Sequence, residues 1–149
     1  MTRWARGEAE IERMLKSGEL QAVTGTAADG GPWLTKAAAT IRTAECISPS
    51  DPHSAYTLAY DAARFACVGL LAQQGLRPTT AGGHYAVQVA VVQQFGSTFA
   101  PYAVMRRRRN ELEYPELPDE TVEPEEAAKA IIDAARKLME HLGFFNLTT

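Results

Sequence analysis

The sequence predicts an all-α protein, an up-and-down bundle of four to five helices, from three observations. Apolar residues recur at helical spacing in most segments, short loops rich in Gly, Pro, Ser and Asp separate those segments, and helix-capping residues precede several of them. The length of 149 residues suits a single domain, and 46% apolar with 22% charged residues is ordinary for a soluble globular protein.

The N-terminal part of the chain predicts one helix and one loop. Ile11, Met14 and Leu15 share a face of a helix over residues 7–18, and the glycine-bearing stretch TGTAADGG reads as a flexible loop. A second helix is expected to begin near Pro32. The expected organisation is therefore an N-terminal helix and loop over 1–33, a bundle over 34–145 and a tail over 146–149.

The segment from 52 to 74 is the most apolar helix that the sequence predicts. Ser50 or Asp51 can cap it, with Pro52 in its first turn. Its apolar residues form two stripes, which is typical of a helix central to a bundle or buried again in an oligomer interface. Asp61 and Arg64 fall on the one remaining polar strip, where an ion pair between them is the simpler interpretation.

Three further helices complete the prediction. The segment HYAVQVAVVQQF alternates like a strand in places, but its Ala and Gln content and its neighbours favour a helix. The next helix, from about 98 to 114, should stop before Pro115 because the residue before a proline avoids helical geometry. The last helix should begin near Pro124.

Composition excludes some function classes. A formal net charge of −3 argues against a surface that coats nucleic acid indiscriminately, although it allows one local basic patch. Cys46 and Cys67 have no metal-ligand spacing, and no cofactor motif is present, so we expect neither a metal nor a cofactor. The stretch MTRWARGEAE has no apolar core, and no run is long enough to span a membrane, so a cytoplasmic protein is expected.

The stretch MRRRRNELEYP, residues 105–115, holds the main functional candidate. Tyr102, Met105 and Leu112 would share an inward face of the helix, and Arg109 falls on the same face. A charged group in an apolar stripe is costly unless it is paired. Glu113, four residues on, could pair with Arg109, so both an interface and a functional role stay open.

The other arginines have a plainer interpretation. Arg106, Arg107 and Arg108 would solvate a face of the helix and pair with nearby acidic residues, for example Arg107 with Glu111. Adjacent arginines point in different directions around a helix, so the four cannot all contact one ligand. In a folded bundle, Arg106, Asp61 and Arg64 could line the same groove as Arg109.

RRRRNELEYP, preceded by the Tyr- and Ala-rich helix AYTLAYDAARFACVGLLAQQGLRP and by GGHYAVQ, resembles the HEPN family of small helical-bundle proteins. The resemblance covers most of the chain, from Leu34 to Leu142. It implies an RNA- or nucleotide-phosphate-binding protein of a bacterial toxin–antitoxin or defence system. It also implies a homodimer in which two arginine helices meet around one cleft, and a nucleotidyltransferase-type antitoxin as a further partner.

The resemblance assigns roles to three residues. HEPN ribonucleases carry an arginine and a polar residue, followed a few positions later by a histidine. Arg109 and Asn110 match the first two, whereas Tyr114 stands at the first position open to the histidine. Metal-independent RNA cleavage needs a group that moves a proton between the 2′-hydroxyl and the leaving oxygen, and a tyrosine with a pKa of about 10 does this poorly at neutral pH.

Two alternatives therefore stay open. In the first, Arg109 grips the phosphate, Asn110 orients it and Tyr114 donates a hydrogen bond or stacks on a base. In the second, the chain is a non-catalytic dimeric scaffold or protein-interaction module, and Arg109 pairs with Glu113 or Asp61. His84, expected at a helix start, is interpreted mainly as a capping or packing residue, with a catalytic stand-in as the less favoured reading.

Overall fold

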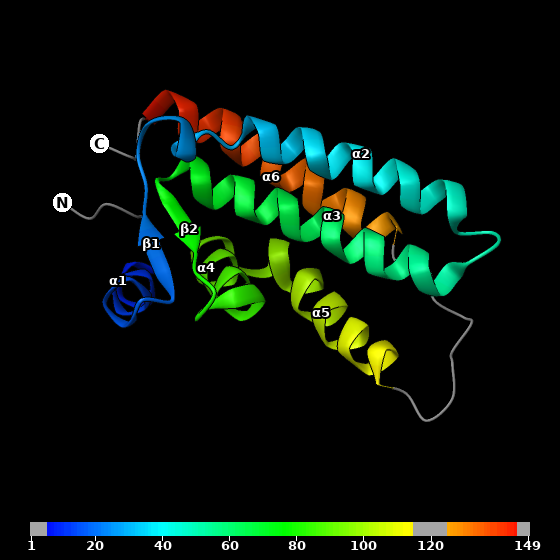
Figure 1. Cartoon of the computed structure of the whole chain (residues 1–149). Helices are drawn as coiled ribbons and strands as arrows, with labels where there is room; N and C mark the ends of the chain where they lie inside the picture. The colour runs from blue at the N-terminus through cyan, green and yellow to red at the C-terminus, as the bar shows by residue number, and fades with distance from the viewer. Residues whose placement is uncertain (1–5, 115–124, 146–149) are drawn as a thin grey trace.

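The computed structural model describes residues 6–114 and 125–145, with side chains described up to residue 140. Over these residues the protein is an all-α helical bundle with one small antiparallel sheet, as Figure 1 shows. The elements in order are α1 (Glu8–Ser17), β1 (Leu20–Ala22), the 3-10 turn η1 (Gly25–Ala28), α2 (Gly31–Ile47), α3 (Pro52–Gln73), β2 (Leu76–Pro78), α4 (Gly83–Phe95), the 3-10 turn η2 (Gly96–Phe99), α5 (Ala100–Glu113) and α6 (Glu125–Phe145).

Helix α3 runs through the centre of the bundle, as its two apolar stripes predict. The Asp51 carboxylate caps it by accepting a hydrogen bond from the Ser54 backbone N–H at 3.1 Å, and Pro52 opens its first turn. Helices α2 and α6 lie along one side of α3, whereas α4 and α5 lie on the other (Figure 1). Most of its residues from Ala55 to Ala72 are buried.

The start of α2 is pressed against α3. A Cβ atom built at Gly30 would lie 2.3 Å from the Gly69 carbonyl oxygen, and one at Gly69 would lie 2.8 Å from the Cβ of Trp33. Only glycine allows two backbones to approach this closely. Helix α2 begins at Gly31, close to the predicted start at Pro32, and runs antiparallel to α3 (Figure 1).

The N-terminal segment packs on the same hydrophobic core as the bundle. Ile11, Met14 and Leu20 are buried in it, and β1 pairs with β2 in the register Leu20↔Pro78 and Ala22↔Leu76. The sheet was not predicted, because strands of three residues are too short to show an alternating pattern. The stretch expected to be a flexible loop contains η1 and leads directly into α2.

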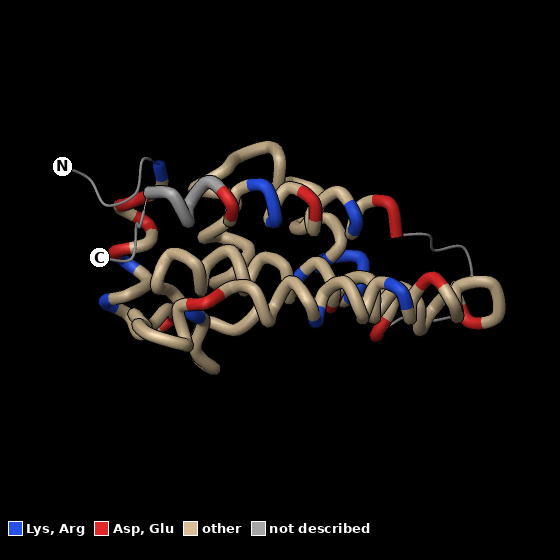
Figure 2. Tube along the Cα trace, turned by 90° about the horizontal axis from the view of Figure 1, so that it is seen from above, with Lys and Arg blue, Asp and Glu red and all other residues tan. Residues whose placement is uncertain are grey.

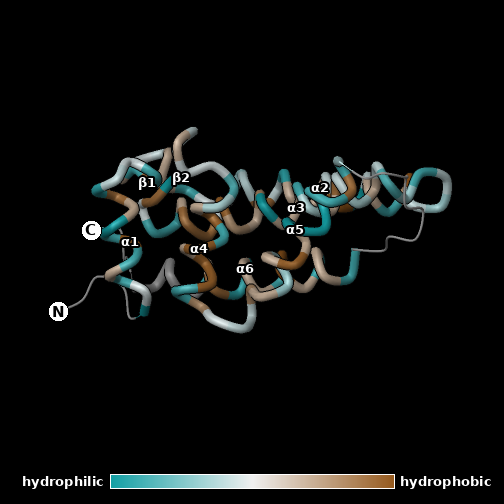
Figure 3. Tube along the Cα trace, turned by 90° about the horizontal axis from the view of Figure 1, so that it is seen from below, coloured by the Kyte–Doolittle hydropathy of each residue, from teal (hydrophilic) through white to brown (hydrophobic). Residues whose placement is uncertain are grey.

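Polar and apolar surfaces separate as the helical patterns predict. Acidic and basic positions alternate along α6 on the outside of the bundle (Figure 2), and Lys129 reaches Glu45 of α2 at 2.6 Å. In Figure 3 the hydrophilic part of α5 lies beside α3. Apolar residues of α4 and α6, such as Val91 and Ile131, are buried in the core. The predicted helix over HYAVQVAVVQQF is confirmed as α4.

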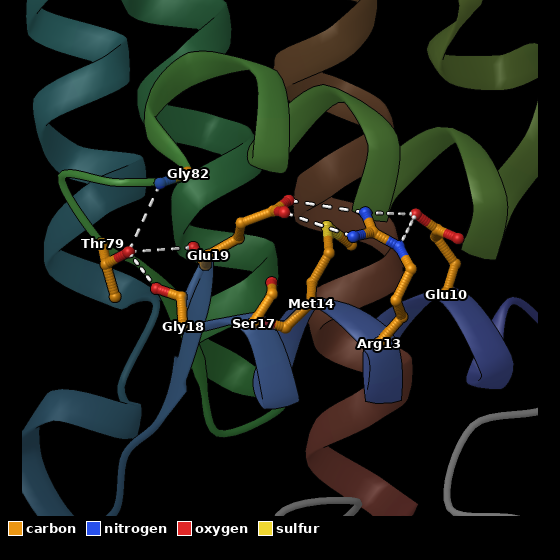
Figure 4. A network of polar contacts seen from close by, with 8 residues as sticks. All are labelled: Glu10, Arg13, Met14, Ser17, Gly18, Glu19, Thr79 and Gly82. Carbon is orange, nitrogen blue, oxygen red and sulfur yellow. Dashed lines mark hydrogen bonds and ion pairs between the residues drawn. The ribbon is translucent and has the colours of Figure 1, made fainter.

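A polar network ties the N-terminal segment to the turn before α4 (Figure 4). The Thr79 hydroxyl donates to the carbonyl oxygens of Gly18 and Glu19 and accepts from the Gly82 backbone N–H. The Arg13 guanidinium pairs with Glu10 at 2.7 Å and with Glu19 at 3.2 Å. This network holds the turn from which α4 starts, and His84 is the second residue of that helix.

Gly82→Ala should destabilise the protein, because the added Cβ would lie 2.3 Å from the Glu19 carbonyl oxygen, a backbone atom with little freedom to move. We expect the free energy of unfolding to fall by about 1–3 kcal/mol, measured by urea denaturation. Gly31→Ala is the matched control, because its Cβ would meet only the Asp29 carboxylate, at 3.2 Å, and should change stability by about 0.5 kcal/mol or less. Equal stabilities of the two variants would contradict the close approach.

Candidate phosphate-binding site

Three aromatic side chains from three helices meet at the centre of the candidate site. The Tyr60 hydroxyl of α3 lies 3.0 Å from Nδ1 of His84, at the start of α4. The same hydroxyl lies 3.4 Å from the hydroxyl of Tyr102 on α5, and the two tyrosine rings stack with centroids 5.6 Å apart. Tyr60 and Tyr102 are fully buried, whereas His84 is only partly buried. The two buried tyrosines therefore support His84 from the interior, while the histidine itself is partly exposed to solvent.

Arg109 lies beside this group, on the inward stripe where the sequence places it. Its guanidinium carbon is 5.7 Å from the centroid of the Tyr60 ring, and its side chain is 25% exposed. The guanidinium also pairs with Glu113 at 3.1 Å, so the predicted Arg109–Glu113 ion pair is present. Tyr102, Met105 and Leu112 are buried around it, as predicted.

Arg106 reaches the same side of α4 from one turn earlier on α5. Its Nε donates to the side-chain oxygen of Gln88, and its guanidinium lies 5.4 Å from the ring centroid of Tyr85. These contacts hold Arg106 against α4 instead of leaving it free in solvent. Glu111 pairs with Arg108 at 3.3 Å, three residues away, rather than with Arg107 as the sequence suggested.

Asp61 and Arg64 of α3 complete the site. Their charged groups lie 3.8 Å apart, so the predicted ion pair is present, but it is long. Nε of Arg64 is buried and has no hydrogen-bond partner among the described residues. The positive charges of Arg64, Arg106 and Arg109 all act on His84. Three arginines from two helices therefore contribute positive charge at one imidazole.

The pKa of His84 is lowered below its ordinary value of 6.5. Partial burial is the main cause, because it disfavours the charged form. The positive charges of Arg64, Arg109 and Arg106 lower the pKa further, while the negative charge of Asp61 opposes them. The imidazole is therefore neutral at pH 7 and able to accept a proton. Burial raises the pKa of Tyr60 and Tyr102, so both hydroxyls stay protonated.

The hydrogen bonds are compatible with a tautomer of His84 that accepts a proton at Nε2. In that tautomer Nδ1–H donates to the Tyr60 hydroxyl, the Tyr60 O–H donates to Tyr102, and the lone pair of Nε2 is available. This tautomer is the one that makes His84 a base.

The sequence-predicted residues separate into two groups. Arg106 lies against α4, Arg109 lies over the Tyr60 ring and pairs with Glu113, and Arg64 pairs with Asp61. Asn110 is exposed, because one residue along a helix turns the side chain by about 100°. Tyr114 follows the last residue of α5 and is 83% exposed. Pro115 and Glu116, the rest of the expected histidine window, lie outside the described residues.

His84, which the sequence predicts mainly as a capping or packing residue, lies in the first turn of α4 and contacts Tyr60 of α3. In the sequence it follows Gly82 and Gly83, and a Tyr-rich helix precedes them. Tyr60 is 24 residues from His84 and 42 residues from Tyr102, so only the packing of α3 against α4 and α5 shows that these side chains meet. No group of three or more His, Cys, Asp or Glu side chains within 6–114 and 125–140 could hold a metal ion.

Arg109→Gln should raise the pKa of His84, because removal of a nearby positive charge makes protonation easier. Asp61→Asn should lower it, because the opposing negative charge is lost. Both shifts can be measured by following the histidine ring signals against pH by NMR. An unchanged pKa in both variants would show that these side chains do not act on the imidazole in solution. Lys137→Gln is the matched charge control, because this exposed lysine is on α6, on the other side of α3 from α4.

Comparisons with known proteins add no identification. A scan against protein-family models found no matching family, and searches of curated proteins and of solved structures found no match. No helix in the described part of the chain is long and apolar enough to cross a membrane.

Proposed function

We propose that this chain is a HEPN-type protein that binds RNA through its phosphates at the α3–α4–α5 site and cleaves it without a metal ion. The observation that supports this proposal most directly is the position of Arg109 over the Tyr60 ring, whose hydroxyl lies 3.0 Å from Nδ1 of His84, with Arg106 held against Tyr85 next to that histidine. A phosphate needs positive charge with several donors, which guanidinium groups supply in a fixed geometry. The net charge of −3 is then no obstacle, because the positive charge is local.

Existing ion pairs do not prevent phosphate from binding. Arg109 pairs with Glu113, whose side chain is 46% exposed, and partners of this kind contribute little because water competes for both charges. Arg64 meets Asp61 only at 3.8 Å. A phosphate oxygen that enters the site can therefore replace or share these carboxylate contacts at small cost.

His84 supplies the proton transfer that Tyr114 is poorly suited to perform. In this mechanism Nε2 of His84 takes the proton of the ribose 2′-hydroxyl, and the 2′-oxygen attacks the phosphorus. The bond from phosphorus to the 5′-oxygen breaks, and the leaving oxygen receives the proton back from His84. Arg109 and Arg106 hold the negative charge that builds on the phosphate oxygens during this exchange. The products are a cyclic phosphate and a 5′-hydroxyl.

The cellular setting remains part of the proposal and rests on the family resemblance. It is a bacterial toxin–antitoxin or defence system in the cytoplasm, with a homodimer as the working form and a nucleotidyltransferase-type antitoxin as a partner. One feature supports a second copy near the arginine helix. Val104 on α5 is 55% exposed beside an apolar groove of about 530 Å³ that Tyr56, Pro101 and Met105 also line.

The alternative function is a non-catalytic scaffold or protein-interaction module. The observation that favours it is that Arg109 and Arg64 both have acidic partners within the chain, at 3.1 Å and 3.8 Å. Salt dependence separates the two functions. Phosphate contacts make RNA affinity fall steeply as salt rises, because binding releases counterions from the RNA. A protein-interaction module should bind little RNA at any salt concentration.

His84→Asn should abolish RNA cleavage in EDTA while leaving RNA affinity nearly unchanged, because asparagine keeps a polar group but cannot take a proton. We expect a rate loss of about 10²–10⁴-fold. His53→Asn is the matched control, since His53 is also partly buried and hydrogen-bonded, to the Leu112 carbonyl at 3.0 Å, but lies outside the site. Equal cleavage by the His84 and His53 variants would remove His84 from the mechanism.

Arg109→Gln should weaken RNA binding and make it depend less steeply on salt, because one phosphate contact is lost.

Tyr114→Phe tests the role that the resemblance assigns to that hydroxyl, and we expect this variant to keep most of the cleavage activity. Cleavage that disappears in Tyr114→Phe and persists in His84→Asn would return the proton transfer to Tyr114. No RNA binding by the unmodified protein at low salt would favour the scaffold function.

A further inference from the structure

Arg64 also lines a cavity to which no described residue of α4 or α5 contributes. It has a volume of about 560 Å³, within the range of small-molecule sites. Its walls come from β1, η1, α2, α3 and β2, so it exists only because the N-terminal segment packs over α3. The side chains that could recognise a ligand are Gln21, Trp33, Arg64, Arg77, Thr79 and Thr80.

The charge of this cavity favours an anion. Arg64 and Arg77 line it, and no acidic residue is among its lining residues in the described part of the chain. Arg77 is exposed and makes no ion pair with any described residue, so its donors are available. Nε of Arg64 is buried without a hydrogen-bond partner among the described residues. A ligand in the cavity would therefore contact Arg64 through the rest of its side chain, which is 23% exposed.

The other half of the cavity favours a flat, apolar group. Trp33 lines it together with Val68, Ala72 and Pro78. The Trp33 side chain is held in place, because its Cβ packs against Gly69 and its ring lies 6.0 Å from the ring of Phe65. An indole held in this way can stack on a planar ring at low entropic cost. Gln21 and Thr80 are exposed polar side chains at the edge, able to meet polar atoms on such a ring.

We propose that this cavity binds one nucleotide, with its base against Trp33 and its phosphate on Arg77 and Arg64. The combination of a fixed indole, two arginines and no acid matches a ligand that is planar at one end and anionic at the other. The site is separate from the one proposed for cleavage, and it does not require that RNA be cleaved. The two sites share Arg64, whose charge also acts on His84.

The shared arginine gives the second site a consequence for the first. A phosphate bound to Arg64 from the cavity would offset part of the positive charge that lowers the pKa of His84. The bound nucleotide is either a free nucleoside phosphate or one nucleotide of a longer RNA strand. Both present the same base and phosphate chemistry, so the experiment separates them by the probe used.

The test uses fluorescence of Trp33. The chain has two tryptophans, so Trp4→Phe in the full-length protein leaves Trp33 as the only one. Titration with AMP should give a saturable change in fluorescence. Adenosine and inorganic phosphate should each bind more weakly than AMP, because each satisfies one half of the cavity. Arg77→Gln should weaken AMP binding about ten-fold, the loss expected for one charged hydrogen bond.

Arg109→Gln is the control that keeps the two proposals distinguishable. It should reduce RNA binding at the cleavage site and leave the AMP titration within about two-fold of the parent, because Arg109 does not line the cavity. A short single-stranded RNA that changes Trp33 fluorescence when AMP does not, and loses this effect in Arg77→Gln, would assign the cavity to a nucleotide within a strand.

Two results would overturn the inference. One is the absence of a saturable fluorescence change with both AMP and the RNA. The other is equal affinity in Arg77→Gln and the parent protein, provided that circular dichroism shows both to be folded. Either result leaves the cleavage proposal standing, because Arg77 is not among the residues that act on His84.

Discussion

The burial of α3 on nearly every side is the constraint on which the rest of the structure depends. Its alanines and glycine let α2 and α6 pack closely along one side, and the contact between Gly30 and Gly69 shows how small the separation becomes. Polar side chains on such a helix can lie only on the remaining strip. Because α4 and α5 cover that strip, Tyr60, Asp61 and Arg64 are brought against residues from two other helices. The site is a consequence of the packing of the bundle.

The chemistry of the site follows from partial burial combined with concentrated positive charge. Partial burial, and after it the positive charges of three arginines, lower the pKa of His84, and the same arginines favour a phosphate. The buried pair Tyr60 and Tyr102 holds the His84 ring through the hydrogen bond from Tyr60, while the network around Thr79 holds the turn from which α4 begins. A phosphate that enters would reduce the positive field at His84, so binding and proton affinity are coupled. Arg64 extends this coupling to the neighbouring cavity, which joins the two proposals through one residue.

Local patterns predicted the helices well but predicted contacts between helices poorly. The stripe of Tyr102, Met105 and Leu112 placed Arg109 correctly on the inward face, and the spacing to Glu113 predicted its ion pair. The sheet was missed because three-residue strands show no pattern. The contact between His84 and Tyr60 was not predicted, because the two residues are 24 positions apart and only tertiary packing joins them. The family motif directed attention to Tyr114, whose position after the end of α5 leaves it exposed. What the sequence could not predict is therefore which side chains of different helices meet.

The central claim is that His84 and Arg109 belong to one phosphate-binding site, and ligand-induced NMR shifts test it most directly. A dinucleotide with a 2′-deoxy group at the scissile position cannot be cleaved, so the complex persists during the measurement. The account predicts that this ligand raises the pKa of His84, because its negative charge stabilises the imidazolium, and that Arg109→Gln reduces the effect. A dinucleotide that binds the protein but leaves the His84 ring signals and pKa unchanged would contradict the account and place the phosphate elsewhere.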